Sequence, residues 1–177
     1  GEIAEADGLR EQGKYEESLN IYQDAMHKNP GAVNAWIGAV RCRIVLEDYD
    51  AALAQIEDAV EIWPERTEFY EMYLEAGRLT EDMETMRAAV RLADENQAES
   101  FLAKLPGMPE LSYESGSYTQ KLELEISTGE QDAGIYYTIQ QEDGQKGENT
   151  PYTAPVKILN GETVVEAWCV RNGIPGR

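Results

Sequence analysis

The sequence predicts an α+β protein of two domains, a short α-solenoid followed by a small antiparallel β-sandwich. Three observations predict it. Pro30 and Pro64 stand 34 residues apart, and a shared pattern of aromatic and small residues precedes each of them. At 105–109 the composition changes from helix-forming residues to residues that favour strands and turns. Apolar and acidic residues then alternate from Leu122 to Ile126, as in a half-buried strand.

The change in composition sets the domain boundaries that we expect. Residues 1–105 form a helical domain, and residues 110–177 form the sandwich. Between them, residues 106–109 place two prolines around a glycine, which predicts a short, stiff linker. The total of 177 residues suits one domain or two small ones.

The net charge limits the partners of this chain. It has 34 acidic and 15 basic residues, a net charge of −19. Residues 1–105 hold 23 acidic and 10 basic residues, net −13, and the remainder hold 11 and 5, net −6. A surface without a basic patch has nothing to neutralise phosphates, so we expect no nucleic-acid partner. No apolar run approaches the ~20 residues of a membrane helix, so we expect no membrane span in this sequence.

The helical half repeats with a period of 34 residues. The matching positions are Tyr15 and Tyr49, Ser18 and Ala52, Tyr22 and Ile56, and Ala25 and Ala59. This pattern resembles the tetratricopeptide repeat, in which each repeat is a pair of helices. Trp36 falls where that family has its early Trp. The small residues let paired helices approach closely, while the large ones fill the space between helices.

A third copy begins near Thr67 but departs from the pattern. The positions that should hold the repeating residues are occupied by Met83, Met86, Val90 and Ala93, and no proline stands at position 98. We therefore expect residues 67–94 to form a degenerate third repeat. Residues 96–105 should then form a capping helix, because the end of a solenoid needs a polar outer face.

The second half contains short segments typical of strands. We expect strands at 111–113, 122–126, 134–138, 151–158 and 163–170, and a turn at Asn160-Gly161. The segments resemble the immunoglobulin-like β-sandwich at the end of chitobiase and β-hexosaminidase chains. The sequence segments that carry this resemblance are Gly116-Ser-Tyr118, Ile135-Tyr-Tyr137-Thr138, Asp143-Gly144, Tyr152-Thr-Ala-Pro155-Val156 and Thr163-Val-Val-Glu-Ala167.

Two departures from that family stand out. Residues 139–142 lengthen the segment before Asp143, and the strand that usually follows the final glycine, here Gly173, is expected to be missing. In those enzymes the module lies outside the catalytic domain, so the resemblance implies no activity. It does imply a bacterial surface or secreted protein, and we expect an extracellular or cell-envelope location, with an anchor in a segment outside this sequence.

Residues suited to catalysis or to metal binding are few. His27 is the one histidine, and its place near the end of a predicted helix favours a surface cap. Cys42 and Cys169 fall in different predicted domains, so we interpret both as buried apolar residues rather than as a disulfide. This set supplies neither a catalytic triad nor a zinc site. We expect a non-enzymatic protein with no cofactor and no bound metal.

The remaining candidate is a binding surface on the helical half. The resemblance implies that the first helix of each pair lines a concave groove, with these positions facing it: Asp7, Arg10, Asn34, Ile37, Arg41, Ile44, Glu68, Glu71, Glu75 and Arg78. Members that clamp a carboxylate use Lys and Arg there, whereas this groove also has an acidic row in its third repeat. The row predicts a basic or neutral protein or peptide partner. A merely solvated helix face, or a face that packs on another domain, stays open as an alternative.

A second binding hypothesis concerns the last strand. Val165, Ala167 and Cys169 share one of its faces, and Trp168 lies on the other, which we expect to be exposed. An exposed Trp168 could stack on a sugar ring of a cell-wall polysaccharide, with the helices as a spacer; packing against a neighbouring strand, a loop or the helical half is the other interpretation. Of the two functions, we favour protein–protein binding or scaffolding through the helical half.

Overall fold

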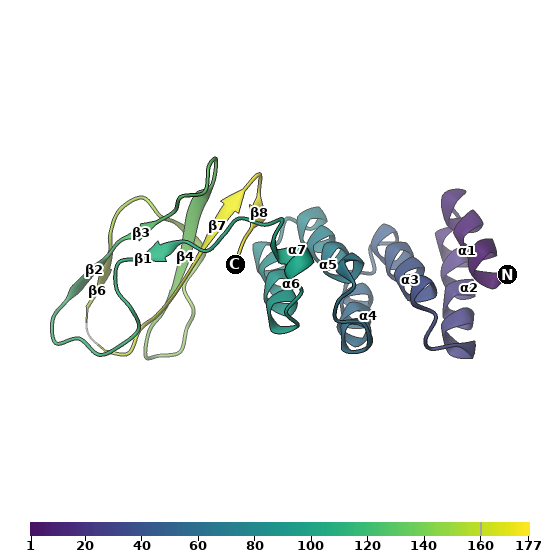
Figure 1. Cartoon of the computed structure of the whole chain (residues 1–177), viewed down its shortest axis with the longest axis horizontal. Helices are drawn as coiled ribbons and strands as arrows, with labels where there is room; N and C mark the ends of the chain where they lie inside the picture. The colour runs from purple at the N-terminus through teal and green to yellow at the C-terminus, as the bar shows by residue number, and fades with distance from the viewer. Residues whose placement is uncertain (160) are drawn as a thin grey trace. The chain divides into compact units, whose positions relative to one another are not determined.

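The structure of the chain is a computed structural model, and it describes residues 1–159 and 161–177. It divides into a helical unit, residues 1–101, and a strand-rich unit, residues 102–177 (Figure 1). The α+β fold predicted from the sequence is therefore confirmed. The predicted turn at Asn160 lies outside the described residues.

The helical unit is a row of antiparallel helix pairs (Figure 1). The described helices are α1 (Glu2–Glu11), α2 (Tyr15–Lys28), α3 (Val33–Val45), α4 (Tyr49–Ile62), α5 (Thr67–Leu79), α6 (Met83–Glu95) and α7 (Glu99–Leu102). The second helices of the three pairs begin at Tyr15, Tyr49 and Met83, each 34 residues after the one before. The predicted period is thus present three times. The capping helix expected at 96–105 is the four-residue α7.

One turn geometry recurs between the two helices of each pair. Gly13, Glu47 and Glu81 occupy equivalent positions and have positive φ angles of 79°, 60° and 52°. The amide of the following residue donates to a carbonyl five residues earlier in each case, from Lys14 to Leu9, Asp48 to Arg43 and Asp82 to Gly77. This is the helix-ending hydrogen bond that a left-handed residue makes possible. The three turns therefore have the same length and shape.

We predict that Glu47→Gly stabilises the chain by about 0.5–1 kcal/mol. Residue 47 is exposed and has a left-handed backbone, which glycine adopts without the penalty of a Cβ atom. Thermal or urea unfolding measures the change. Glu47→Ala is the matched control, because it removes the same charge but keeps the Cβ atom; equal stability of the two variants would contradict this account.

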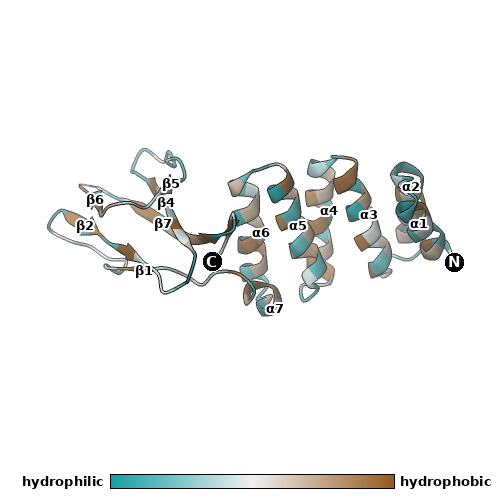
Figure 2. Ribbon diagram, turned by 90° about the horizontal axis from the view of Figure 1, so that it is seen from above, coloured by the Kyte–Doolittle hydropathy of each residue, from teal (hydrophilic) through white to brown (hydrophobic). Residues whose placement is uncertain are grey.

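The core of the helical unit repeats with the turns. The equivalent trios Ser18, Ala52 and Met86; Tyr22, Ile56 and Val90; and Ala25, Ala59 and Ala93 are all at most 6% exposed. Small side chains, or the flexible chain of a methionine, fill the same close approaches in every pair. The residues that made the third copy look degenerate thus still pack as a full helix pair. Figure 2 shows the hydrophobic and hydrophilic stretches that alternate along these helices.

An aromatic side chain ties each proline-containing turn to the helix that follows. Trp36 Nε1 donates to the Pro30 carbonyl at 3.1 Å, and the Tyr70 hydroxyl donates to the Pro64 carbonyl at 2.6 Å. These two contacts are 34 residues apart at both ends. Trp36 also meets Trp63 edge-to-face, and Trp63 stacks on Phe69. The aromatic cluster therefore joins the second helix pair to the third.

We predict that the stability of the helical unit falls between pH 10 and pH 12. Burial, and then the charge of Glu65, raise the pKa of Tyr70 to about 12. A raised folded-state pKa contributes stability below the unfolded value of about 10, and this contribution is lost as the pH rises toward the folded value. Tyr70→Phe should reduce the slope of unfolding free energy against pH there by at most ~1.4 kcal/mol per pH unit.

Urea titrations at pH 9, 10, 11 and 12 measure that slope. Tyr22 and Tyr73 also have raised pKa values, chiefly through burial, so the variant should keep part of the alkaline loss. Tyr118→Phe is the matched control, because this hydroxyl belongs to an exposed side chain in the strand-rich unit. An unchanged slope in Tyr70→Phe would count against the buried phenol as the cause.

The strand-rich unit consists of short antiparallel strands. The described strands are β1 (Glu110–Leu111), β2 (Leu122–Leu124), β3 (Ile126–Ser127), β4 (Gly134–Gln140), β5 (Thr150–Pro151), β6 (Val156–Ile158), β7 (Val164–Arg171) and β8 (Ile174–Pro175). They pair as β1–β3, β2–β6 and a four-stranded sheet in the order β5–β4–β7–β8. The alternation predicted from Leu122 to Ile126 is present, with a break at Glu125 between β2 and β3.

An apolar cluster fills the space between these sheets. Leu124, Ile126 and Val156 are its fully buried members. Half-buried side chains from β4 and β7 pack against them, among them Ile135, Tyr137, Ile139, Val165 and Ala167. The face of the last strand that we predicted to be buried therefore does face a core, and Cys169, at 0% exposure, lies on the same side.

Two features of this unit differ from the sequence prediction. A short strand, β8, follows Gly173 and pairs with β7, because Asn172 and Gly173 both have positive φ angles and turn the chain back sharply. The segment 106–109 belongs to the strand-rich unit instead of standing free as a linker. Glu130 holds it, accepting from the Gly107 amide at 2.8 Å and from Arg171 at 2.5 Å.

Candidate functional site

A cavity of about 210 Å³ opens on the side of the helical unit that the first helices of the pairs form. Its lining comes from α1, α3 and α5, and consists of Asp7, Arg10, Asn34, Ile37, Gly38, Arg41 and Glu68. Helices α1 and α3, and α3 and α5, pack against each other, so the side chains on this face of the three helices converge. We call this face the groove.

The structure brings together six of the ten residues predicted to face the groove. Four do not line the cavity. Ile44 is 8% exposed and turns into the helix layer, where its neighbour Val45 takes the exposed position. Glu71, Glu75 and Arg78 lie farther along α5, and Arg78 donates to both carboxylate oxygens of Glu75, at 2.8 and 2.5 Å. The acidic row predicted on α5 is thus partly neutralised within its own helix.

Tyr22 supplies a buried link beneath the cavity. Its ring is 0% exposed on α2, but its hydroxyl reaches α1, where it donates to Asp7 and accepts from Arg10 Nε at 3.1 Å. Burial, and then the hydrogen bond to Asp7, raise the pKa of this phenol, so it stays protonated and able to donate. The hydrogen bond from Arg10 makes that guanidinium part of the wall of the groove. Sequence reasoning had assigned Tyr22 to packing alone.

Gly38 makes room for that ring. A Cβ atom at position 38 would overlap the Tyr22 ring, with two ring carbons at 2.5 and 2.6 Å. Gly38 is buried and lies within α3, where glycine is otherwise unfavourable. The absence of a side chain at position 38 therefore allows α2 and α3 to approach with a tyrosine between them. The repeat pattern gave no signal for this residue.

We predict that Gly38→Ala destabilises the helical unit by about 1–3 kcal/mol, because the added methyl group displaces the ring of Tyr22. Urea unfolding measures the effect. Gly8→Ala is the matched control in the interior of α1, where nothing lies within 4 Å of the added atom, and it should stabilise by about 0.5–1 kcal/mol. Equal signs for the two variants would refute the packing argument.

The third helix pair contributes a carboxylate to the cavity. Arg66 Nη2 donates to Glu68 Oε2 at 2.9 Å. Burial by itself would raise the pKa of Glu68, but a backbone hydrogen bond and the charges of Arg66 and Arg41 outweigh it, and the pKa lies below its usual value. Glu68 is therefore an anion that already has a partner.

Two polar side chains of α3 face the cavity without a direct contact of their own. Asn34 and Arg41 are both exposed, and in the described chain neither side chain makes a hydrogen bond or an ion pair, although the charge of Arg41 acts on the Glu68 carboxylate. They are seven residues apart, two helical turns, so they lie on one face of α3. One more turn along, Val45 is 51% exposed, and Leu79 at the equivalent position of α5 is 47% exposed. The repeat spacing could have identified this apolar pair.

The alternative site in the strand-rich unit is not available as predicted. Trp168 is 1% exposed, and its ring stacks on Tyr136 across the β4–β7 pair, with ring centres 6.5 Å apart. We expected an exposed ring because Trp168 lies on the face of the strand opposite Val165, Ala167 and Cys169; Val164, on the same face as Trp168, is 50% exposed. A buried ring offers no flat surface to a sugar. The prediction of an exposed, sugar-stacking ring at Trp168 is therefore wrong.

The structure also places the two cysteines and the histidine that the sequence analysis considered. Cys42 is buried, and its thiol donates to Ser18 Oγ at 3.6 Å, while Ser18 donates to the Ala6 carbonyl at 2.6 Å. Burial raises the pKa of the Cys42 thiol. His27 is exposed at the end of α2. Both cysteines are free thiols.

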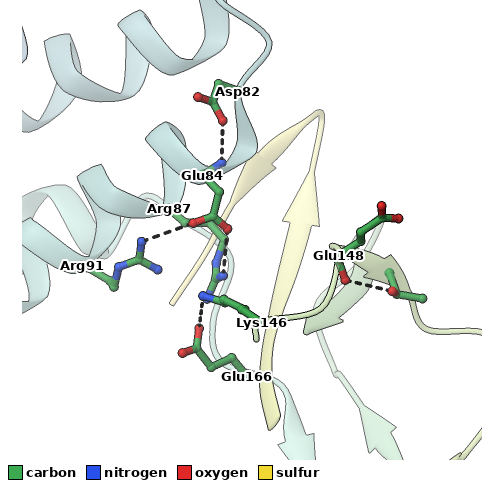
Figure 3. A network of polar contacts seen from close by, with 8 residues as sticks. Asp82, Glu84, Arg87, Arg91, Lys146, Glu148 and Glu166 are labelled. Atoms are coloured by element: carbon green, nitrogen blue, oxygen red, sulfur yellow. Dashed lines mark hydrogen bonds and ion pairs between the residues drawn. The ribbon is translucent and has the colours of Figure 1, made fainter. Parts of the chain in front are cut away.

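Figure 3 shows a network of polar contacts outside the groove. On α6, the Asp82 carboxylate accepts from the Glu84 amide at 3.0 Å and caps the helix, while Arg87 and Arg91 each approach Glu84 at 3.8 Å. In the strand-rich unit, Lys146 pairs with Glu166 at 3.3 Å. Among the described residues, no group of three or more metal-ligating side chains comes together. No helix there has the length and apolar character that crossing a membrane requires.

Comparison with known proteins bears on the helical unit. Residues 9–72 match the family model of the tetratricopeptide repeat. The chain matches no curated protein sequence. Among solved structures it is similar to an alternative dimer form of SycD, the type III secretion translocator chaperone of Yersinia enterocolitica. The TM-score is 0.50 at 19% identity, over 58% of this chain and 81% of that one, which shows the fold alone.

The family match covers fewer helices than the repeating helix geometry does. The match runs from α1 into α5 and stops before α6, where the sequence of the third copy departs from the pattern. The third pair nonetheless repeats the turn, the period and the buried positions of the other two. Residues 9–72 therefore carry tetratricopeptide repeats, and the third helix pair repeats their geometry.

Proposed function

We propose that this protein is a non-enzymatic interaction module that binds a segment of a protein partner in the groove of its helical unit. The observation that carries the proposal is the cavity on α1, α3 and α5, with the exposed side chains of Asn34 and Arg41 in its wall, which make no hydrogen bond or ion pair within the described chain. Stacked helical repeats form concave surfaces of this kind, and such surfaces bind extended partners.

The polar groups of the groove suit a peptide chain. A peptide presents carbonyl and amide groups at regular intervals, and the Asn34 amide can both donate to and accept from them. The Arg41 guanidinium offers donors only, so it suits a carbonyl or a carboxylate. Ile37 adds an apolar wall to the same cavity. Together these groups match a segment of polypeptide better than a small apolar ligand.

The charge of the helical unit favours a basic or neutral partner. Residues 1–105 have a net charge of −13, so a strongly acidic protein would be repelled during approach. Glu71 and Glu75 lie on α5 beyond the cavity, and Arg78 partly neutralises this row through Glu75. The proposed partner therefore has a neutral or positive net charge over the segment that meets α5.

We predict that Glu71→Lys/Glu75→Lys weakens binding of basic and neutral peptides, by roughly tenfold for the best binders. The full chain would be immobilised and exposed to a phage-displayed library of random peptides, and retained peptides would be sequenced. Glu16→Lys/Glu17→Lys is the matched control, since it makes the same charge change at exposed positions of α2, a second helix outside the groove lining. Equal losses in both variants would place the effect in net charge and overturn the groove assignment.

We also propose a cell-envelope or extracellular location, with the strand-rich unit as a chitobiase-type appendage that acts as a spacer. This proposal is supported by the sequence segments within residues 116–167 that resemble the chitobiase-type domain and by the antiparallel sheets around one core. Fractionation of the source cells with an antibody against residues 102–177 tests it. Recovery of the protein with the cytosolic fraction alone would overturn it.

A further inference from the structure

We propose that the groove selects a segment carrying one side-chain carboxylate, read by Arg41, and an apolar side chain close to it, received by Val45 and Leu79. The inference rests on the proposed function and adds to it the chemistry of the recognised segment. It assigns different roles to arginines that look equivalent in the sequence.

Among the described residues, the arginines predicted to face the groove differ in their contacts. Arg10 donates to Tyr22 and lies 3.9 Å from Asp7, and Arg78 is held by both oxygens of Glu75. By contrast, the exposed Arg41 makes no hydrogen bond or ion pair within the described chain, and only its charge acts on the nearby Glu68. A guanidinium with all its donors open is complementary to a carboxylate, which it can bind through two parallel hydrogen bonds.

The apolar part of the site lies next to Arg41 on the same helix face. Val45 follows Arg41 by four residues, which is about 6 Å along the axis of α3. Leu79 occupies the equivalent position of α5, the helix that packs beside α3, and both side chains are about half exposed. Two exposed apolar side chains at matching positions of adjacent helices form a small apolar surface beside the cation.

The spacing of these two features fits an extended peptide. Side chains two residues apart in an extended chain point the same way and are separated by about 6.6 Å. That distance matches the rise from Arg41 to Val45. The recognised pattern is therefore an acidic residue and an apolar residue with one residue between them. Because the helical unit is strongly negative, the surrounding residues of the segment are neutral or basic.

Selection from a defined peptide library tests this inference. The probe is a library of random nonapeptides with acetylated amino ends and amidated carboxyl ends, so that every carboxylate in it belongs to a side chain. The full chain should enrich peptides with Asp or Glu two positions from Leu, Ile, Val or Met. Arg41→Ala should lose the enrichment of acidic residues and keep that of apolar residues. Val45→Thr/Leu79→Gln should do the opposite.

Affinity measurements on the best selected peptide give the magnitudes. Arg41→Ala should weaken binding by about tenfold, and replacing the peptide's Asp by Asn should weaken binding to the unaltered chain by a similar factor. The two changes together should cost little more than either alone, because they remove the same contact. Lys121→Ala, an exposed position of the strand-rich unit, makes the same charge change and should have no effect.

The outcomes separate this inference from the proposed function. If the chain retains peptides without any acidic position, and Arg41→Ala retains the same set, the carboxylate site is wrong while the groove still binds peptides. If the losses from Arg41→Ala and from the Asp-to-Asn peptide simply add, Arg41 does not contact the carboxylate. If the unaltered chain retains no peptide at all, both the inference and the proposed function fail.

Discussion

The helical unit depends on one constraint, the equal length and shape of the turns within its helix pairs. A single pair of helices cannot bury its apolar side alone, so each pair must be covered by the next. The left-handed residues at Gly13, Glu47 and Glu81 end each first helix at the equivalent position, and the same hydrogen bond closes each turn. Every pair therefore presents its small residues to the same neighbour, and the period of 34 residues is the result.

The groove is a consequence of this regularity. Because the turns are equal, the first helices of the pairs all arrive on one side, and residues as distant in sequence as Asp7, Arg41 and Glu68 line a single cavity. Tyr22 then links the two layers, since its ring fills the space left by Gly38 and its hydroxyl reaches α1. Tyr22 thus contributes both packing and hydrogen bonds, and a change at Gly38 would affect both.

Charge pairing, more than net charge, defines what the groove offers to a partner. The helical half is strongly acidic, yet Glu68 and Glu75 already have arginine partners, and Arg10 is bound to Tyr22. Such exposed ion pairs contribute little to stability, but they occupy the donors that a ligand would otherwise use. The pairing leaves Asn34 and Arg41 as open polar groups on α3, beside the apolar Val45.

The sequence by itself determined the repeat, the division into helical and strand-rich halves, and most of the groove lining. The repeat follows from a local rule, since the spacing of Tyr15, Ala25 and Pro30 recurs, whereas the groove positions Asn34, Ile37 and Arg41 were implied by the resemblance to the tetratricopeptide repeat. Only the tertiary structure decided that Trp168 is buried, that Ile44 turns inward while Val45 faces out, and that residues 106–109 are held by Glu130. Each of these depends on which distant element covers a side chain or accepts its hydrogen bond, and the pattern within one segment carries no information about that neighbour.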